Sequence, residues 1–86
     1  MAGKKTNRKA LTLEDKQKVY KKIGKRLKKL REGKGYSAAL IFAYENDLPP
    51  AQYARYETGS NMKIDSLLKV LNAMDISLQD FFAGIE

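Results

Sequence analysis

The longest regular pattern in the chain is a mixture of apolar and basic positions over residues 12–32. Four apolar residues recur there at intervals of four, four and three positions: Val19, Ile23, Leu27 and Leu30. These intervals place the four side chains on one face of a helix. Thr12 is a suitable N-cap residue, and Gly33 and Gly35 supply two helix breakers. The pattern predicts a helix that begins after Thr12 and ends near Glu32.

A second, short helix is predicted over about residues 38–45, with Ser37 as its cap. Its candidates for burial are nearly contiguous and cannot all face one side of a helix: Leu40, Ile41, Phe42, Ala43 and Tyr44. Asn46 and Asp47 follow, and Asn and Asp are the residues besides glycine that best tolerate a left-handed backbone. We therefore expect a tight turn, after which Leu48 points back into the core.

A third helix is predicted over about residues 50–57. Pro49 and Pro50 suit its start, because proline lacks the N–H group that the first turn of a helix leaves unpaired. The pair Thr58-Gly59 supplies a C-terminal glycine signal that ends it.

Two more helices are predicted in the last third of the chain. The fourth covers about residues 65–74, and its apolar face consists of Ile64, Leu67, Leu68, Leu71 and Met74. The fifth starts at Ser77, which forms a Ser-x-x-Asp capping pattern with Asp80. It carries three apolar residues: Leu78, Phe81 and Phe82.

The order of these elements predicts the fold class. No internal repeat and no strand pattern is present, and loops of two to five residues suit a compact bundle. We expect an all-α, five-helix domain over residues 12–86, preceded by a flexible basic tail over residues 1–11.

The composition excludes several classes of protein. The 86 residues include no cysteine and no histidine, which rules out a disulfide and a thiolate metal site and removes the commonest catalytic base. We therefore expect no enzyme, cofactor or metal site, and no small-molecule ligand. No apolar run approaches the length of a membrane span, and the N-terminus lacks the apolar segment of a secretory signal. A soluble protein of the cytoplasm is the expectation.

The charge is distributed unevenly. Residues 1–34 hold 14 Lys and Arg against 3 Asp and Glu, a net charge of +11, whereas residues 35–86 have a net charge of −4. This surplus suggests a polyanionic partner for the first part of the chain. A solvated Lys-rich helix would show the same surplus, so charge alone leaves the partner open.

Residues 43–57 have the spacing of a helix-turn-helix. Ala43 is a small residue inside a short helix, where two steeply crossing helices bring their backbones close together. A tight turn follows, and then a helix whose inward positions are Tyr53 and Tyr56. An ordinary helical corner can have the same spacing, so the pattern alone does not decide between the two.

Three longer stretches are similar to a known family. They are IGKRLKKLREGKGYS, FAYENDLPPAQYARYETG and SLLKVLNAMDISLQDFF, in this order. Over about residues 23–82 the chain resembles the Cro/repressor-type helix-turn-helix family, also called XRE-like. The resemblance implies a lambda-repressor-like fold and sequence-specific binding to double-stranded DNA, as in a bacterial or phage-type transcriptional regulator.

The resemblance also implies roles for individual residues. Arg31 and Glu57 correspond to a family pair that forms an internal salt bridge and holds the reading helix in place. That helix would lie in the major groove, with four outward positions near the bases: Pro50, Ala51, Gln52 and Arg55. Arg55 can donate two hydrogen bonds to guanine, and Gln52 can bridge the N6 and N7 atoms of adenine. Pro49, Pro50 and Ala51 stand at positions where members of the family usually carry polar side chains, so few direct contacts to the bases are expected, and the shape of the DNA and water-mediated contacts would contribute more.

Phosphate contacts are expected from residues that flank the reading helix: Ser37, Thr58, Asn61 and Lys63. Backbone N–H groups at the N-termini of the second and third helices are further donors. Ala38 or Ala39 occupies the position where the family often carries a phosphate-contacting Gln. The basic tail can either enter a minor groove or serve only solubility.

Two other functions stay open. One is a protein-interaction module, such as an antitoxin or adaptor, with DNA binding secondary. A short last helix needs fewer apolar residues than this segment carries, so Phe81, Phe82 and Ile85 could contact a partner. The other is a membrane-surface protein that uses the Lys-rich first helix as an amphipathic anchor. We disfavour this function because a small core needs the apolar face of that helix, formed by Val19, Ile23, Leu27 and Leu30. We also hypothesise a homodimer that forms only on DNA, since family repressors often bind two half-sites.

Overall fold

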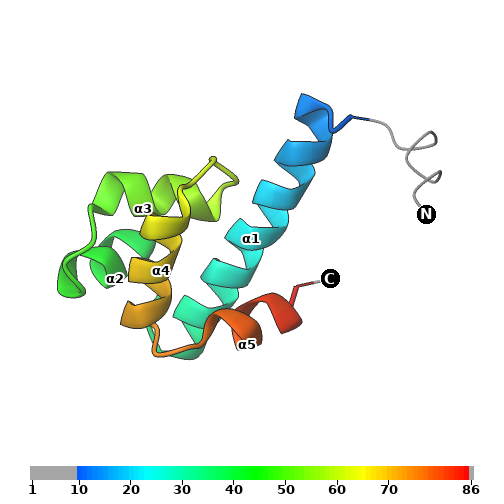
Figure 1. Cartoon of the computed structure of the whole chain (residues 1–86). Helices are drawn as coiled ribbons and strands as arrows, with labels where there is room; N and C mark the ends of the chain where they lie inside the picture. Colours follow the sequence, from blue (N-terminus) through cyan, green and yellow to red (C-terminus); the bar gives the residue numbers. More distant parts are fainter. Residues whose placement is uncertain (1–9, 86) are drawn as a thin grey trace.

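The structure, a computed structural model, describes residues 10–85 of the chain and is all-helical over that range (Figure 1). Its five helices are α1 (Leu13–Gly33), α2 (Ala39–Glu45), α3 (Pro50–Glu57), α4 (Ile64–Ala73) and α5 (Leu78–Ala83). The prediction of an all-α, five-helix domain is confirmed. Residues 1–9 of the predicted tail lie outside the described residues, and Ala10 and Leu11 are exposed and not helical.

Helix α1 begins and ends where its local signals predict. The Thr12 hydroxyl accepts a hydrogen bond of 3.0 Å from the backbone N–H of Asp15. The Asp15 carboxylate accepts one of 3.1 Å from the N–H of Thr12, which completes a capping box. The backbone N–H of Lys34 closes the last turn on the carbonyl groups of Leu30 and Arg31.

The apolar stripe of α1 is only partly buried, which corrects the prediction for Val19. Leu27 is fully buried and Ile23 and Leu30 are half-buried, but Val19 is 52% exposed. Figure 1 shows the reason: the first turns of α1 extend past α2, α3, α4 and α5, so none of these helices covers them. The argument that Val19 completes the core is therefore wrong. No helix within residues 10–85 is long and apolar enough to cross a membrane.

Helix α2 differs from its prediction at its start and in its buried face. Its N-cap is Ala38, which offers no side-chain hydrogen bond, so the expected Ser37 cap is wrong. The helix starts one residue later than predicted, and this moves Ser37 out of the capping position. Of the five apolar candidates only Phe42 and Ala43 are buried. The exposed ones are Leu40 (54%), Ile41 (53%) and Tyr44 (77%).

The turn between α2 and α3 matches its prediction. Asp47 adopts a left-handed backbone with φ 58°, and the N–H of Leu48 donates to the carbonyl of Ala43 at 2.9 Å. The carbonyl of Phe42 accepts two hydrogen bonds from Asn46, one of 3.1 Å from its backbone N–H and one of 2.8 Å from its side-chain amide, which ties the turn to the end of α2. Leu48 is buried, as predicted.

The core lies between α1, α2, α3 and α4, with one contribution from α5. Its buried members are Leu27, Phe42, Ala43, Leu48, Tyr53, Tyr56, Leu67, Val70, Leu71, Met74 and Phe81. The ring of Phe42 lies 5.1 Å from that of Tyr36 and 5.2 Å from that of Tyr53. The aromatic rings of α2 and α3 therefore form the centre of the domain, which fixes the rotation of α3 about its axis.

Helices α4 and α5 bury narrower faces than predicted. Ile64 and Leu68 of α4 are exposed, and Val70 is buried instead. Ser77 caps α5 by accepting the N–H of Asp80 at 3.0 Å, as predicted. Phe81 is fully buried, while Leu78 and Phe82 remain exposed.

Candidate nucleic-acid interface

The orientation of α3 follows from its two buried tyrosines. Tyr53 and Tyr56 are three residues apart, so both point to the same side of the helix, and both are buried. The face on the opposite side is consequently left to solvent. Within this helix, burial of aromatic rings decides which residues can meet a partner.

The four residues that the resemblance assigns to base reading are all exposed: Pro50, Ala51, Gln52 and Arg55. Ala51 and Gln52 lie four and three residues before Arg55, which makes them neighbours on the outer face of α3. Pro50 is the first residue of the helix. The structure thus brings a guanidinium group and a carboxamide group together on a face that no other described element covers.

The N-terminus of α3 offers few backbone donors. The N–H of Tyr53 already donates to the carbonyl of Pro49 at 2.9 Å, and neither Pro49 nor Pro50 has an N–H group. Ala51 and Gln52 hold the free N–H groups of the first turn. This end of the helix can therefore donate two backbone hydrogen bonds to an anion.

The four predicted phosphate contacts lie in two places. Thr58, Asn61 and Lys63 are exposed in the loop between α3 and α4, whereas Ser37 is exposed in the loop before α2. The hydroxyl of Thr58 donates to the carbonyl of Arg55 at 2.9 Å, so its proton is already used inside α3. Asn61 and Lys63 are the better donors of this group.

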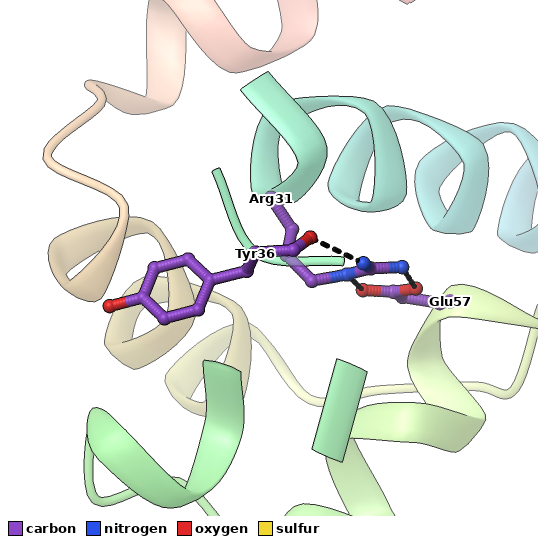
Figure 2. A network of polar contacts seen from close by, with 3 residues as sticks. All are labelled: Arg31, Tyr36 and Glu57. Atoms are coloured by element: carbon purple, nitrogen blue, oxygen red, sulfur yellow. Dashed lines mark hydrogen bonds and ion pairs between the residues drawn. The ribbon is translucent and has the colours of Figure 1, made fainter. Parts of the chain in front are cut away.

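A buried ion pair ties the end of α3 to α1. Arg31 donates to both carboxylate oxygens of Glu57, each at 2.8 Å, and a third hydrogen bond of 2.8 Å reaches the carbonyl of Tyr36 (Figure 2). The two side chains are only 5% and 7% exposed. The hydrogen bonding that Arg31 donates to the Glu57 carboxylate raises the pKa of Arg31. The salt bridge that the resemblance implied is confirmed.

A glycine lets α1 approach the same end of α3. A Cβ atom on Gly24 would lie 2.5 Å from the carbonyl oxygen of Glu57 and 2.6 Å from that of Tyr56. No side chain fits there, so the backbones meet directly. The sequence analysis did not predict this contact. The signal for it is the position of Gly24 inside a helix, where glycine is about 1 kcal/mol less favourable than alanine and so needs a reason such as close packing.

Tyr53 carries a buried hydroxyl beside the ion pair. This hydroxyl has no hydrogen-bond partner within the described residues. Burial, followed by the nearby Glu57 carboxylate, raises the pKa of Tyr53, so its hydroxyl stays protonated in the folded protein.

The basic residues are concentrated on α1 rather than on α3. Residues 13–33 hold nine Lys and Arg against three Asp and Glu, whereas Arg55 is the one basic residue of α3. Residues 10–85 contain no cluster of acidic side chains that could hold a metal ion. Any attraction between α3 and a polyanion therefore depends on Arg55, on Lys63 in the following loop, and on the positive electrostatic potential of the basic residues of α1.

Comparison with protein-family models found no match, and no curated protein or solved structure showed a significant similarity to this chain.

Proposed function

We propose that this chain binds double-stranded DNA through the outer face of α3 and acts as a cytoplasmic transcriptional regulator of the bacterial or phage type. One observation carries the proposal. Gln52 and Arg55 lie side by side on an exposed face of a short helix, whose buried face and C-terminal end are held by α1, α2 and the Arg31–Glu57 pair. A rigid helix of this kind, with polar side chains outward, fits the major groove.

Base readout by this face depends on few groups. Arg55 can donate a fork of two hydrogen bonds to the O6 and N7 atoms of a guanine, and Gln52 can pair with an adenine. Ala51 can contact a thymine methyl group but forms no side-chain hydrogen bond. We expect a short preferred site with one strongly specified base pair, supplemented by the shape of the groove.

Selection from random duplexes at moderate salt, followed by sequencing, tests the proposal. The affinity for the selected duplex should fall steeply as salt increases, because Lys and Arg displace counterions from the phosphates. The variant Arg55→Ala should lose about 10-fold or more in affinity and the preference for one guanine. Gln79→Ala, an exposed change on α5, is the control and should bind like the wild type. Absence of duplex affinity even at low salt would refute the proposal.

The oligomeric state is part of the proposal. The chain would bind as a homodimer that assembles on two half-sites about one helical turn apart. Mass measurement in solution, with and without the selected duplex, checks this. A monomer that becomes two chains per duplex is the expected result, and a stable dimer without DNA contradicts it.

The exposed apolar face of α2 favours one alternative function. Leu40, Ile41 and Tyr44 lie together on this helix and are all more than half exposed. Such a patch is typical of a surface that meets another protein. The residues that first suggested this alternative support it less, because Phe81 is fully buried and Ile85 packs against the core. A chain that binds no duplex at low salt, but binds a protein partner unless Tyr44 is changed to Gln, would favour an antitoxin or adaptor.

A further inference from the structure

A groove lined by positive charge runs between α1 and the residues that follow α5. It has a volume of about 420 Å³ and is lined by Lys22, Lys25, Arg26, Lys29, Gly84 and Ile85. Four of these six lining residues are cationic, and none of the six is acidic. The proposed function of α3 does not use this cluster of positive charge.

The groove lies on the side of α1 that faces away from α3. Gly24, Leu27 and Arg31 form the face of α1 that meets α3 and the core. Lys22 and Lys29 each lie two residues from a member of that face, which in a helix is more than half a turn away. In Figure 1, α3 lies to the left of α1, and the last turn of α5 (red) lies on the opposite side of α1 from α3.

Arg26 forms a wall of the groove and is itself held in place. It donates hydrogen bonds of 3.1 Å to the carbonyl groups of Phe81 and Asp80, at the end of α5. Its guanidinium group packs directly on Gly84, where a Cβ atom would overlap it. Two donors of Arg26 thus fix α5 against α1, so this wall of the groove is preformed.

The three lysines of the groove are available to a partner. Within residues 10–85 the side-chain ion pairs are Arg31–Glu57 and Lys69–Asp65, and neither involves a groove lysine. Lys22, Lys25 and Lys29 are all exposed. Three like charges within two turns of a helix repel one another, and a row of phosphate groups relieves that repulsion.

The partner that this surface fits is a nucleic-acid duplex. A duplex backbone presents regularly spaced phosphates along a ridge, which matches lysines spaced along one side of α1. A lipid surface fits less well, because membrane-surface helices place large apolar side chains beside their basic ones. Ile85 is the single large apolar residue of the groove, and it is half-buried.

We propose that the α1–α5 groove is a second binding surface for the phosphate backbone of DNA, so that one molecule can hold two duplex segments on opposite sides of α1. This inference rests on the proposed function of α3. It adds that two duplexes are bound at once, because one straight duplex cannot contact both sides of the domain.

A bridging experiment on the full chain tests the proposal. A 20-base-pair duplex with the selected site is immobilised, protein is loaded, and capture of a second, labelled duplex of scrambled sequence is measured. The variant Lys25→Gln/Lys29→Gln should lower this capture about 10-fold or more, and should lower its salt exponent by about two. The control Lys16→Gln/Lys34→Gln removes the same charge from two exposed positions outside the groove, one in α1 and one at its C-cap, and should capture like the wild type.

The outcomes separate this proposal from the proposed function. Equal capture by the groove variant and the wild type overturns the inference. Binding to vesicles of phosphatidylserine that needs Lys25 and Lys29, without capture of the second duplex, also overturns it. If Arg55→Ala leaves the first duplex bound normally while the groove variant abolishes all duplex binding, the assignment of α3 fails and the groove remains the DNA surface. Circular dichroism confirms that each variant is folded.

Discussion

Arg31 donates two parallel hydrogen bonds of 2.8 Å to the carboxylate of Glu57, and this buried pair joins the last turn of α1 to the last residue of α3. The pair connects residues that are 26 positions apart in the chain. It leaves the outer face of α3 free, because both charged groups point inward. The stability of the domain and the orientation of α3 therefore depend on the same contact.

The first prediction concerns this ion pair. Glu57→Gln should destabilise the domain by about 3–5 kcal/mol, because it leaves the guanidinium of Arg31 buried without a counter-charge. Thermal unfolding followed by circular dichroism measures the loss. Asp65→Asn, which breaks the exposed pair Lys69–Asp65, is the control and should change the melting temperature very little. A similar effect of the two changes would show that the buried pair is unimportant.

The second prediction uses two glycines of α1. Gly24→Ala should destabilise the domain by about 1–3 kcal/mol, because the added methyl group collides with the carbonyl oxygens of Tyr56 and Glu57. Gly33→Ala should stabilise it by up to about 1 kcal/mol, because nothing lies within 4 Å of the added atom. Denaturant unfolding compares the two variants. Stabilisation by both changes would contradict the close contact between α1 and α3.

The third prediction concerns the buried hydroxyl of Tyr53. Tyr53→Phe should leave stability at pH 7 unchanged or increase it, because the hydroxyl has no hydrogen-bond partner in the described structure. The pKa of Tyr53 is raised in the folded protein, so at high pH the unfolded chain loses the tyrosine proton and the folded chain keeps it. Stability that is fully present below pH 10 is therefore lost as the pH rises further.

Unfolding at pH 7 and pH 11 checks the pH dependence. The wild type should lose about 1.4 kcal/mol more than Tyr53→Phe by pH 11, which corresponds to one proton released on unfolding over one pH unit. Tyr44→Phe removes an exposed hydroxyl and serves as the control, with the same alkaline loss as the wild type. Parallel losses for the wild type and Tyr53→Phe would mean that Tyr53 titrates normally.

The fourth prediction separates stability from binding with two arginines. Arg26→Ala should destabilise the domain by about 2 kcal/mol, because two carbonyl groups of α5 lose a charged hydrogen-bond donor. Arg55→Ala changes an exposed side chain and should leave the melting temperature nearly unchanged while weakening DNA binding. Chemical unfolding and duplex titration are compared for both variants. An equal loss of unfolding free energy in both variants would contradict the assigned roles.

The bounds of most helices could be predicted because their signals are local. Thr12 caps α1 through an atom three residues away, Asp47 turns the chain by its own backbone conformation, and Pro50 starts α3 by lacking an N–H group. Each of these effects involves neighbours in the chain and needs no other helix. The outer face of α3 was likewise predictable, because two tyrosines three residues apart identify its inner face.

Burial and long-range contacts were decided by the tertiary structure. The pattern of α1 treats Val19 and Leu27 alike, yet only Leu27 has other helices around it. Nothing near Gly24 in the sequence shows that the carbonyl groups of α3 will lie against it, and nothing near Arg26 identifies the end of α5 as its partner. Local preferences determine where a helix starts and stops, because a cap or turn is completed within a few residues. Which face of that helix is buried depends on segments tens of residues away, and only the folded chain brings those segments together.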